Sequence, residues 1–220
     1  MKGPSLLIVF LTCIIIIPTE ALAISLTPVD DAYVDDLNGA TPQLVTSVNY
    51  LRWWDNGTVD QRTSMEFDIS SLTANSNTKI LSLSLVPGGG FTGGASLLVH
   101  GYTGDGVVSL SDMTVTNPIA GPFTDVIGEP STYHDDIQSI DVTAYVDSLI
   151  LAGETYVGFM LMATGPVPGF PLSGWTQIGS SEYPDVNLRP SLSEVPIPPA
   201  LYLFGSGLLG LFRMGRLKKA

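Results

Sequence analysis

The last 26 residues constrain what the rest of the chain forms, because their order of segments suits a membrane and not a soluble core. A Pro-rich segment at 195–200 is followed by an apolar run from Leu201 to Phe212 and then by a basic end. The prolines resist helix, and the basic end indicates a cytoplasmic terminus by the positive-inside rule. These features predict a membrane helix over about 198–214, which is short for a bilayer. The basic residues are Arg213, Arg216, Lys218 and Lys219.

This tail resembles the PEP-CTERM sorting signal of Gram-negative bacteria, in its VPLPA-like variant. The resemblance covers all three parts of the tail. It implies that an exosortase, a protease of the inner membrane, cuts near the prolines and releases the domain to the cell surface or to an exopolysaccharide matrix. The alternatives are an ordinary C-terminal anchor and an apolar tail that packs onto the domain. The motif residues are Val195, Pro196, Ile197, Pro198, Pro199 and Ala200.

The first 23 residues have the pattern of a secretory signal peptide. Lys2 precedes an apolar run from Leu6 to Ile17, and the small residues Ala21 and Ala23 stand where signal peptidase recognises its substrate. We therefore expect the secretion translocase and signal peptidase to act on the chain. The only cysteine, Cys13, lies in this segment, so the mature chain has no disulfide framework.

The segment between the two ends, residues 24–194, is the predicted folded domain. Its length suits one core that buries about 70% of the surface of the unfolded chain. Without the two ends, four of the nine basic residues and 20 of the 21 acidic residues remain, which gives a net charge of about −16. Such a charge argues against nucleic acid as a partner. Solubility outside the cell is the simplest explanation of the charge, with binding of calcium or of a cationic surface as alternatives.

Apolar and polar residues alternate through much of the domain, with the period of a β-strand. In Arg62–Asp68, Met65 and Phe67 point one way and the polar residues the other, so a half-buried strand is predicted. The Asn56-Gly57 pair predicts a turn through which residues 44–54 pair with this strand. Further strands are predicted at Ala32–Val34, Leu81–Leu85, Leu97–Tyr102, Val157–Ala163, Trp175–Ile178 and Ser191–Val195.

One segment, Val142–Ile150, has helical spacing, with Asp141 or Thr143 placed to cap it and Gly153 to end it. The other elements are short strands separated by turn clusters, without a repeat of about 20 to 50 residues. These features predict an all-β fold, an antiparallel β-sandwich of jelly-roll type with one short helix. The Gly- and Pro-rich segments 87–94 and 166–174 are predicted to be loops.

The order of several segments also resembles a family. It is similar to the DNRLRE-type domain, a β-sandwich related to carbohydrate-binding modules and found in secreted bacterial proteins. The resemblance implies the same fold over residues 24–194. The segments that carry it are DAYV at 31–34, RTSMEFDISSL at 62–72, ILSLSL at 80–85, IDVTAYVDSL at 140–149, GETYVGFMLMA at 153–163 and SSEYPDVNLRPSL at 180–192.

The densest group of aromatic residues is Tyr50, Trp53 and Trp54. Sugars bind proteins by stacking on such rings, and neighbouring positions of a strand face opposite ways. One of the two tryptophans is therefore expected to face the core, and the other is a candidate sugar platform. Burial of both rings in the core is the alternative.

No active site is predicted. The only imidazoles are His100 and His134, and the chain has no Gly-x-Ser-x-Gly motif. No metal ligands or cofactor are assigned. Residues 101–112 are similar to a calcium-binding loop but lack side-chain oxygens at two ligand positions, so we expect a glycine-rich turn there. The better calcium candidate is the acidic cluster of Asp30, Asp31, Asp35, Asp36 and Asn38.

Three functions are compatible with these features. The first is a non-enzymatic exported protein, an inner-membrane precursor that is then released by an exosortase-type system to the cell surface or extracellular polysaccharide matrix. The second is a carbohydrate-binding module with a specific glycan ligand. The third, which the absence of a catalytic motif disfavours, is a polysaccharide-active enzyme. A glycan array separates the first two.

Overall fold

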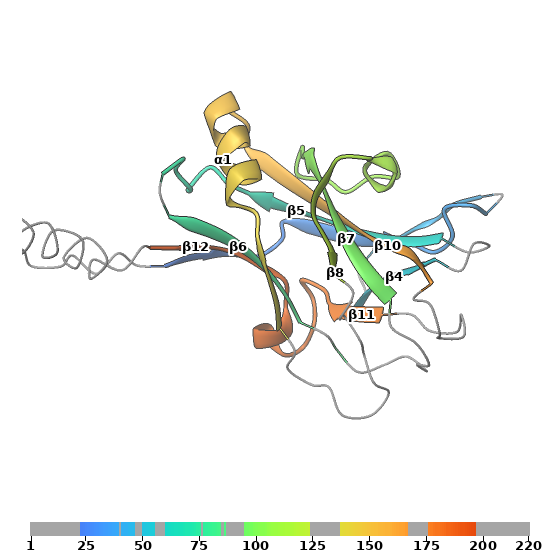
Figure 1. Cartoon of the computed structure of the whole chain (residues 1–220). Coiled ribbons are helices and arrows are strands. Elements are labelled where there is room, and N and C mark those ends of the chain that lie inside the picture. Colours follow the sequence, from blue (N-terminus) through green and yellow to red (C-terminus); the bar gives the residue numbers. More distant parts are fainter. Residues whose placement is uncertain are drawn as a thin grey trace, which may run out of the picture. The chain divides into compact units, whose positions relative to one another are not determined.

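The structure is a computed structural model that describes residues 23–39, 41–46, 50–55, 60–75, 77–84, 86, 95–123, 137–166 and 176–196. These residues belong to one compact unit, Ala23–Ile197. Its described part consists mostly of strands in two antiparallel sheets, with one short α-helix (Figure 1). This is the arrangement of a β-sandwich.

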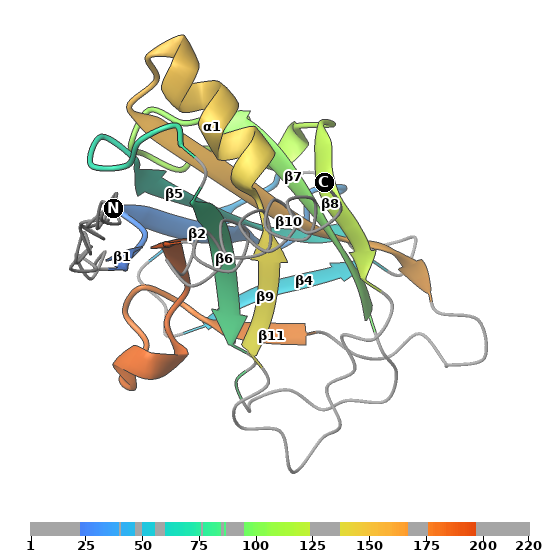
Figure 2. The same cartoon turned by 60° about the vertical axis from the view of Figure 1, so that its left-hand side comes forward.

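The smaller sheet has four strands and is built partly from the two ends of the unit (Figure 2). The last strand lies between the first strand and the middle of the sheet, so that Ile24 pairs with Glu194 and Glu194 pairs with Lys79. The order of its strands is β1 (Ile24–Leu26), β12 (Ser191–Val195), β6 (Thr78–Ser84) and β9 (Ile137–Asp141).

The larger sheet has eight strands. Six follow the order β11-β4-β5-β10-β7-β8, while β2 also pairs with β5, and β3 pairs with β2. The predicted pairing of residues 44–54 with β5 is confirmed for β4, because Trp54 lies opposite Gln61, whereas β3 pairs with β2 instead. The predicted turn at Asn56-Gly57 lies outside the described residues. The bounds are β2 (Asp30–Val34), β3 (Leu44–Val45), β4 (Tyr50–Asp55), β5 (Asp60–Asp68), β7 (Ala95–Thr103), β8 (Pro118–Phe123), β10 (Tyr156–Pro166) and β11 (Thr176–Gly179).

The main core lies between the two sheets, where the alternating apolar positions meet. Phe67 of β5 and Phe159 of β10 pack edge to face, with ring centroids 5.9 Å apart. Leu81 and Leu83 approach from β6 of the smaller sheet. The predicted inward faces of β5 and β10 are therefore confirmed. Each such side chain contributes about 1.5 to 3 kcal/mol on burial, so this core is the main stabilising feature of the fold.

The prediction that β5 is only half-buried is wrong. Its polar face is covered as well, since Ser64 is 0% and Glu66 1% exposed. The cover is the segment 104–117 after β7, which includes the short 3-10 helix η1 (Asp112–Thr114). Under this cover lies a second apolar cluster on the outer side of the larger sheet, formed by Ala32, Val34, Val108 and Met113.

The predicted helix is confirmed as α1 (Thr143–Ala152). Val146 and Leu149 are its buried residues, and Asp141 accepts a hydrogen bond from the Thr143 N–H at 2.9 Å. Gly153 ends the helix with a φ of 83°, in the left-handed region that glycine tolerates without steric cost.

Strands β1, β3, β8 and β9 were not predicted as separate elements. In β8, the residues Pro118, Gly121 and Pro122 hide the signal of a strand. The strand is tolerated because it stands at the end of the sheet, where a missing N–H interrupts no ladder on the outer side. A second 3-10 helix, η2 (Val186–Leu188), lies between β11 and β12.

Candidate functional site

The two ends of the folded unit meet at one place, which we call the tail junction: Ala23, Ile24, Val195 and Pro196. Ile24 is the first residue of β1, directly after the predicted signal-peptidase site. It pairs with Glu194, and the next residue, Val195, makes the last pair of β12, with Thr78. The predicted site residues Ala21, Ile197 to Ala200, Arg213, Arg216, Lys218 and Lys219 lie outside the described residues.

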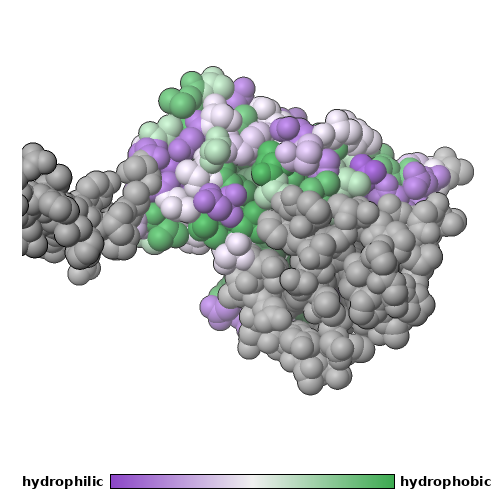
Figure 3. Space-filling view, in the orientation of Figure 1, coloured by the Kyte–Doolittle hydropathy of each residue, from purple (hydrophilic) through white to green (hydrophobic). Residues whose placement is uncertain are grey.

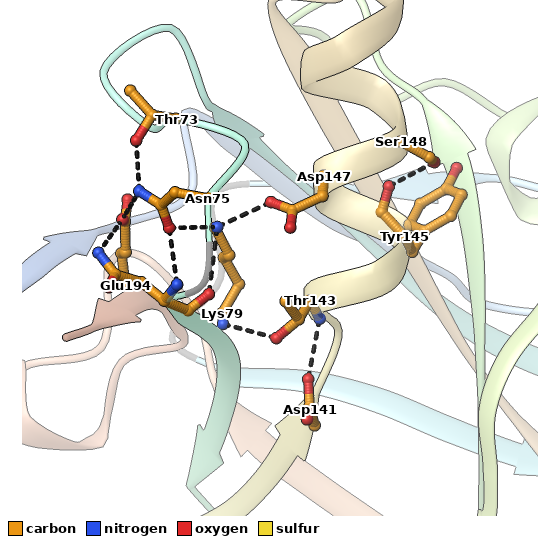
Figure 4. A network of polar contacts seen from close by, with 10 residues as sticks. Thr73, Asn75, Lys79, Asp141, Thr143, Tyr145, Asp147, Ser148 and Glu194 are labelled. Atoms are coloured by element: carbon orange, nitrogen blue, oxygen red, sulfur yellow. Dashed lines mark hydrogen bonds and ion pairs between the residues drawn. The ribbon is translucent and has the colours of Figure 1, made fainter. Parts of the chain in front are cut away.

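Behind the tail junction a lysine is buried in the end of the sandwich. The Lys79 side chain is 0% exposed, and its Nζ lies 2.7 Å from Oδ1 of Asp147 in α1. It also donates to the Asn75 side chain and to the Asn77 carbonyl, each at 3.2 Å (Figure 4). A buried ammonium without partners would be strongly destabilising, so this ion pair and the two hydrogen bonds account for its place in the fold.

Glu194, only 5% exposed, occupies the same pocket of polar groups from the β12 side. Its Oε1 accepts hydrogen bonds from Asn75 Nδ2 at 2.7 Å and from Asn77 Nδ2 at 2.6 Å (Figure 4). Burial by itself would raise the pKa of Glu194, but these hydrogen bonds and the Lys79 charge together lower it below its ordinary value. The carboxylate is therefore held in its charged form.

We call these five residues, Asn75, Asn77, Lys79, Asp147 and Glu194, the β12 clasp. It joins β12 to β6, to the segment after β5 and to α1. Its contacts place the charges and amides against partners, and the ammonium forms an ion pair with the Asp147 carboxylate. Chemically, the clasp suits fixing the last strand at the point where the tail begins. The sequence did not reveal it, because its members are spread over about 120 residues and unite only through strand pairing.

The candidate sugar-binding residues Tyr50, Trp53 and Trp54 all belong to β4. Trp53 pairs with Thr176 and Trp54 with Gln61. Which ring is exposed concerns side chains outside the described ones, so the sugar platform stays a prediction.

The acidic cluster does not converge on one point. Asp30 accepts from the Val108 N–H at 2.8 Å, Asp31 from the Ser181 N–H at 2.6 Å, and Asp36 from the Asn38 N–H at 3.1 Å. Across the described ranges, no group of three or more His, Cys, Asp or Glu side chains is arranged to hold a metal ion. These carboxylates instead serve as acceptors for loops from different parts of the chain.

The segment 104–117 is held to the outer face of the larger sheet by buried polar side chains of β5. Glu66 accepts from the N–H groups of Asp105 at 2.9 Å and Gly106 at 2.6 Å, and burial raises its pKa. Arg62 donates to the Met113 carbonyl at 2.8 Å. The expected glycine-rich turn therefore acts as a cover. Alternation made Glu66 look exposed, and no local signal in the sequence could have shown the cover.

Two further side chains complete this outer face. The ring of Tyr102 occupies the space that a Cβ at Gly158 would need. His100 is 6% exposed, and burial together with the Arg62 charge lowers its pKa, so the imidazole is neutral at pH 7. Its environment is that of a packed strand position. His134 lies outside the described residues.

Exposed apolar side chains are scattered, and hydrophilic and hydrophobic residues are interspersed on the face shown in Figure 3. Leu151 on α1 is the most exposed of the large apolar side chains described, at 79%. Val195, at the tail junction, is 44% exposed although its backbone is paired. The remaining described ones are Val29, Val107, Leu110 and Val186.

No protein-family model matches this sequence, and the search of curated proteins finds no match. Among the described residues, no helix has the length and apolar character needed to cross a membrane. The predicted membrane helix, about 198–214, and the signal peptide lie outside those residues.

Proposed function

We propose that this is a non-enzymatic exported protein, which is made as an inner-membrane precursor and released by an exosortase-type protease. Its destination is the cell surface or the extracellular polysaccharide matrix of a Gram-negative bacterium. The signal peptide is residues 1–23, the domain 24–194, and the sorting signal 195–220. The PEP-CTERM-like tail motivates the proposal, together with the DNRLRE-like order of segments.

The observation that carries the proposal is where the ladder of β12 stops. Its last pair is Val195 with Thr78, and the motif that begins at Val195 continues with Pro196, whose lack of an N–H suits the end of a strand. The last described strand thus overlaps the motif only at Val195. A tail that packs onto the domain as part of its core would not need a proline directly after the strand.

The order of strands supports a jelly roll as the fold. Eight strands are numbered 1 to 8 along the chain (β1, β5, β6, β7, β8, β9, β10, β12), and β2, β3, β4 and β11 are left out. The order is then 1-8-3-6 in the smaller sheet and 2-7-4-5 in the larger one. This order is that of two interlocked Greek keys. Such a scaffold suits a binding or matrix protein, although the fold by itself does not define a function.

The test is the fate of the tail in cells that contain an exosortase. We expect the mature protein outside the inner membrane, with an intact mass that lacks both the signal peptide and the basic tail. The matched control is the triple variant Pro196→Ala, Pro198→Ala and Pro199→Ala, which should accumulate uncut, because alanine lets the helix extend through the motif. Wild-type protein that keeps Arg213 to Ala220 and stays in the inner membrane would refute the proposal and indicate a permanent anchor.

A carbohydrate-binding module is the second candidate, favoured by the aromatic strand β4. Binding of one defined glycan on an array, with an affinity that falls when Trp53 or Trp54 is replaced by Ala, would support it. Retention on crude matrix polysaccharide without a defined ligand would favour the first function. Release of sugar from that polysaccharide would instead indicate an enzyme.

A further inference from the structure

We infer that the folded domain sets the upstream limit for removal of the tail, so that the released protein keeps Val195 and Pro196. The inference rests on the proposed function, because it names the part of the chain that the releasing protease can reach. It is carried by the position of β12 and by the β12 clasp.

The middle of strand β12 offers no free edge to a protease. A protease binds its substrate as an extended segment through main-chain hydrogen bonds, which requires free backbone N–H and C=O groups. From Leu192 to Glu194, β12 is paired on both sides, with β1 and with β6, whereas Val195 pairs with β6 alone. Cleavage within the strand therefore needs local opening of the smaller sheet.

The end of β12 is also held against fraying. Opening its last two residues would withdraw the buried Glu194 carboxylate from its two hydrogen bonds with the amides of Asn75 and Asn77. It would also remove a negative charge from the surroundings of the buried Lys79. Broken buried polar contacts of this kind are costly, so the open population is small.

Pro196 is the first residue beyond this protection. The ladder ends at Val195, and proline has no N–H with which to extend it. The protease therefore finds its extended segment from Pro196 onward, and the cut falls downstream of the Val195–Pro196 bond. A cut upstream of Glu194 would remove a member of the β12 clasp and part of a central strand, and the product would be destabilised.

One test is independent of any exosortase. Full-length protein in mild detergent is treated with a Glu-specific endoprotease, and the fragments are followed by mass. Glu154 and Glu182 are exposed and serve as internal references. We expect cleavage after both to precede cleavage after Glu194. Cleavage after Glu194 as fast as after Glu182 would overturn the inference.

The double variant Asn75→Ala and Asn77→Ala removes the two donors to Glu194. Cleavage after Glu194 should then become about tenfold faster or more, because about 1.4 kcal/mol or more of local stability is lost and the open population rises in proportion. Asn187→Ala, which removes an exposed asparagine bonded to Asp185, is the matched control and should leave the rate unchanged. Cleavage of the double variant after the buried Glu66 would show that this variant is unfolded. The inference is then decided by the rates of wild-type cleavage after Glu194 and after Glu182.

In cells, the intact mass of the released protein gives the second readout. A C-terminus at or beyond Pro196 agrees with both proposals. A C-terminus at Val195 or upstream of it in released protein overturns this inference and leaves the proposed function standing. If no release occurs, the proposed function fails, and the protection of Glu194 from the endoprotease still decides whether the fold limits access to the tail junction.

Discussion

Replacing Asp31 by Asn should make the domain more stable at neutral pH, although it removes a charge from an acidic cluster. Asp31 in β2 is 4% exposed and accepts a hydrogen bond from the Ser181 N–H at 2.6 Å. Burial raises its pKa from 3.8 to about 6, and the nearby charges of Glu182 and Asp30 add to this effect. The Asn side chain can accept the same hydrogen bond without a buried charge.

The pKa difference sets the size and sign of the effect. A change from 3.8 to about 6 corresponds to about 3 kcal/mol of folding free energy. The folded state holds the proton more tightly, so this stability is fully present below about pH 3.8 and is lost as the pH rises through 6. The free energy of unfolding of Asp31→Asn, relative to wild type, should therefore rise by about 2 to 3 kcal/mol between pH 4 and pH 7.

The measurement is urea unfolding of a polypeptide of residues 24–197 at a series of pH values from about 2 to 8, because the control at Asp68 changes mainly under about pH 4. Asp68→Asn is a control of opposite sign, because hydrogen bonds from Ser70 lower the pKa of this exposed carboxyl. The lead of wild type over Asp68→Asn should shrink as the pH falls. Parallel curves for wild type and Asp31→Asn across this range would show that Asp31 is solvated, and would refute the packing of the loop around Ser181.

Three further outcomes are expected. Gly158→Ala should destabilise the domain by about 1 to 3 kcal/mol in urea unfolding, because its Cβ would overlap with the Tyr102 ring. Of Trp53→Ala and Trp54→Ala, one should cost about 3 to 5 kcal/mol and the other should only reduce retention on matrix polysaccharide; two destabilising changes with unaltered retention would place both rings in the core. Neutralising the four basic tail residues should weaken membrane retention of uncut precursor, measured by fractionation.

Local pattern was sufficient for much of the fold. Strand alternation identified the inward residues of β5 and β10, such as Phe67 and Phe159, because a residue's own neighbours decide which face of a strand it occupies. The helix followed from its spacing and from Gly153. Edge strand β8 was missed, since its prolines are acceptable only at a position in the sheet that local sequence does not show.

The candidate site also has one part that local sequence predicts and one part that only the tertiary structure shows. The tail motif and its basic end are contiguous, so the sequence by itself is enough to predict a sorting signal and its start at Val195. The β12 clasp was decided by tertiary structure, because Asn75, Lys79, Asp147 and Glu194 meet only when β12 pairs with β6 and α1 packs over the end of the sandwich. Likewise, Glu66 is buried only because a distant segment folds across it. Alternation assigns a face to each residue, whereas burial of that face depends on contacts between remote parts of the chain.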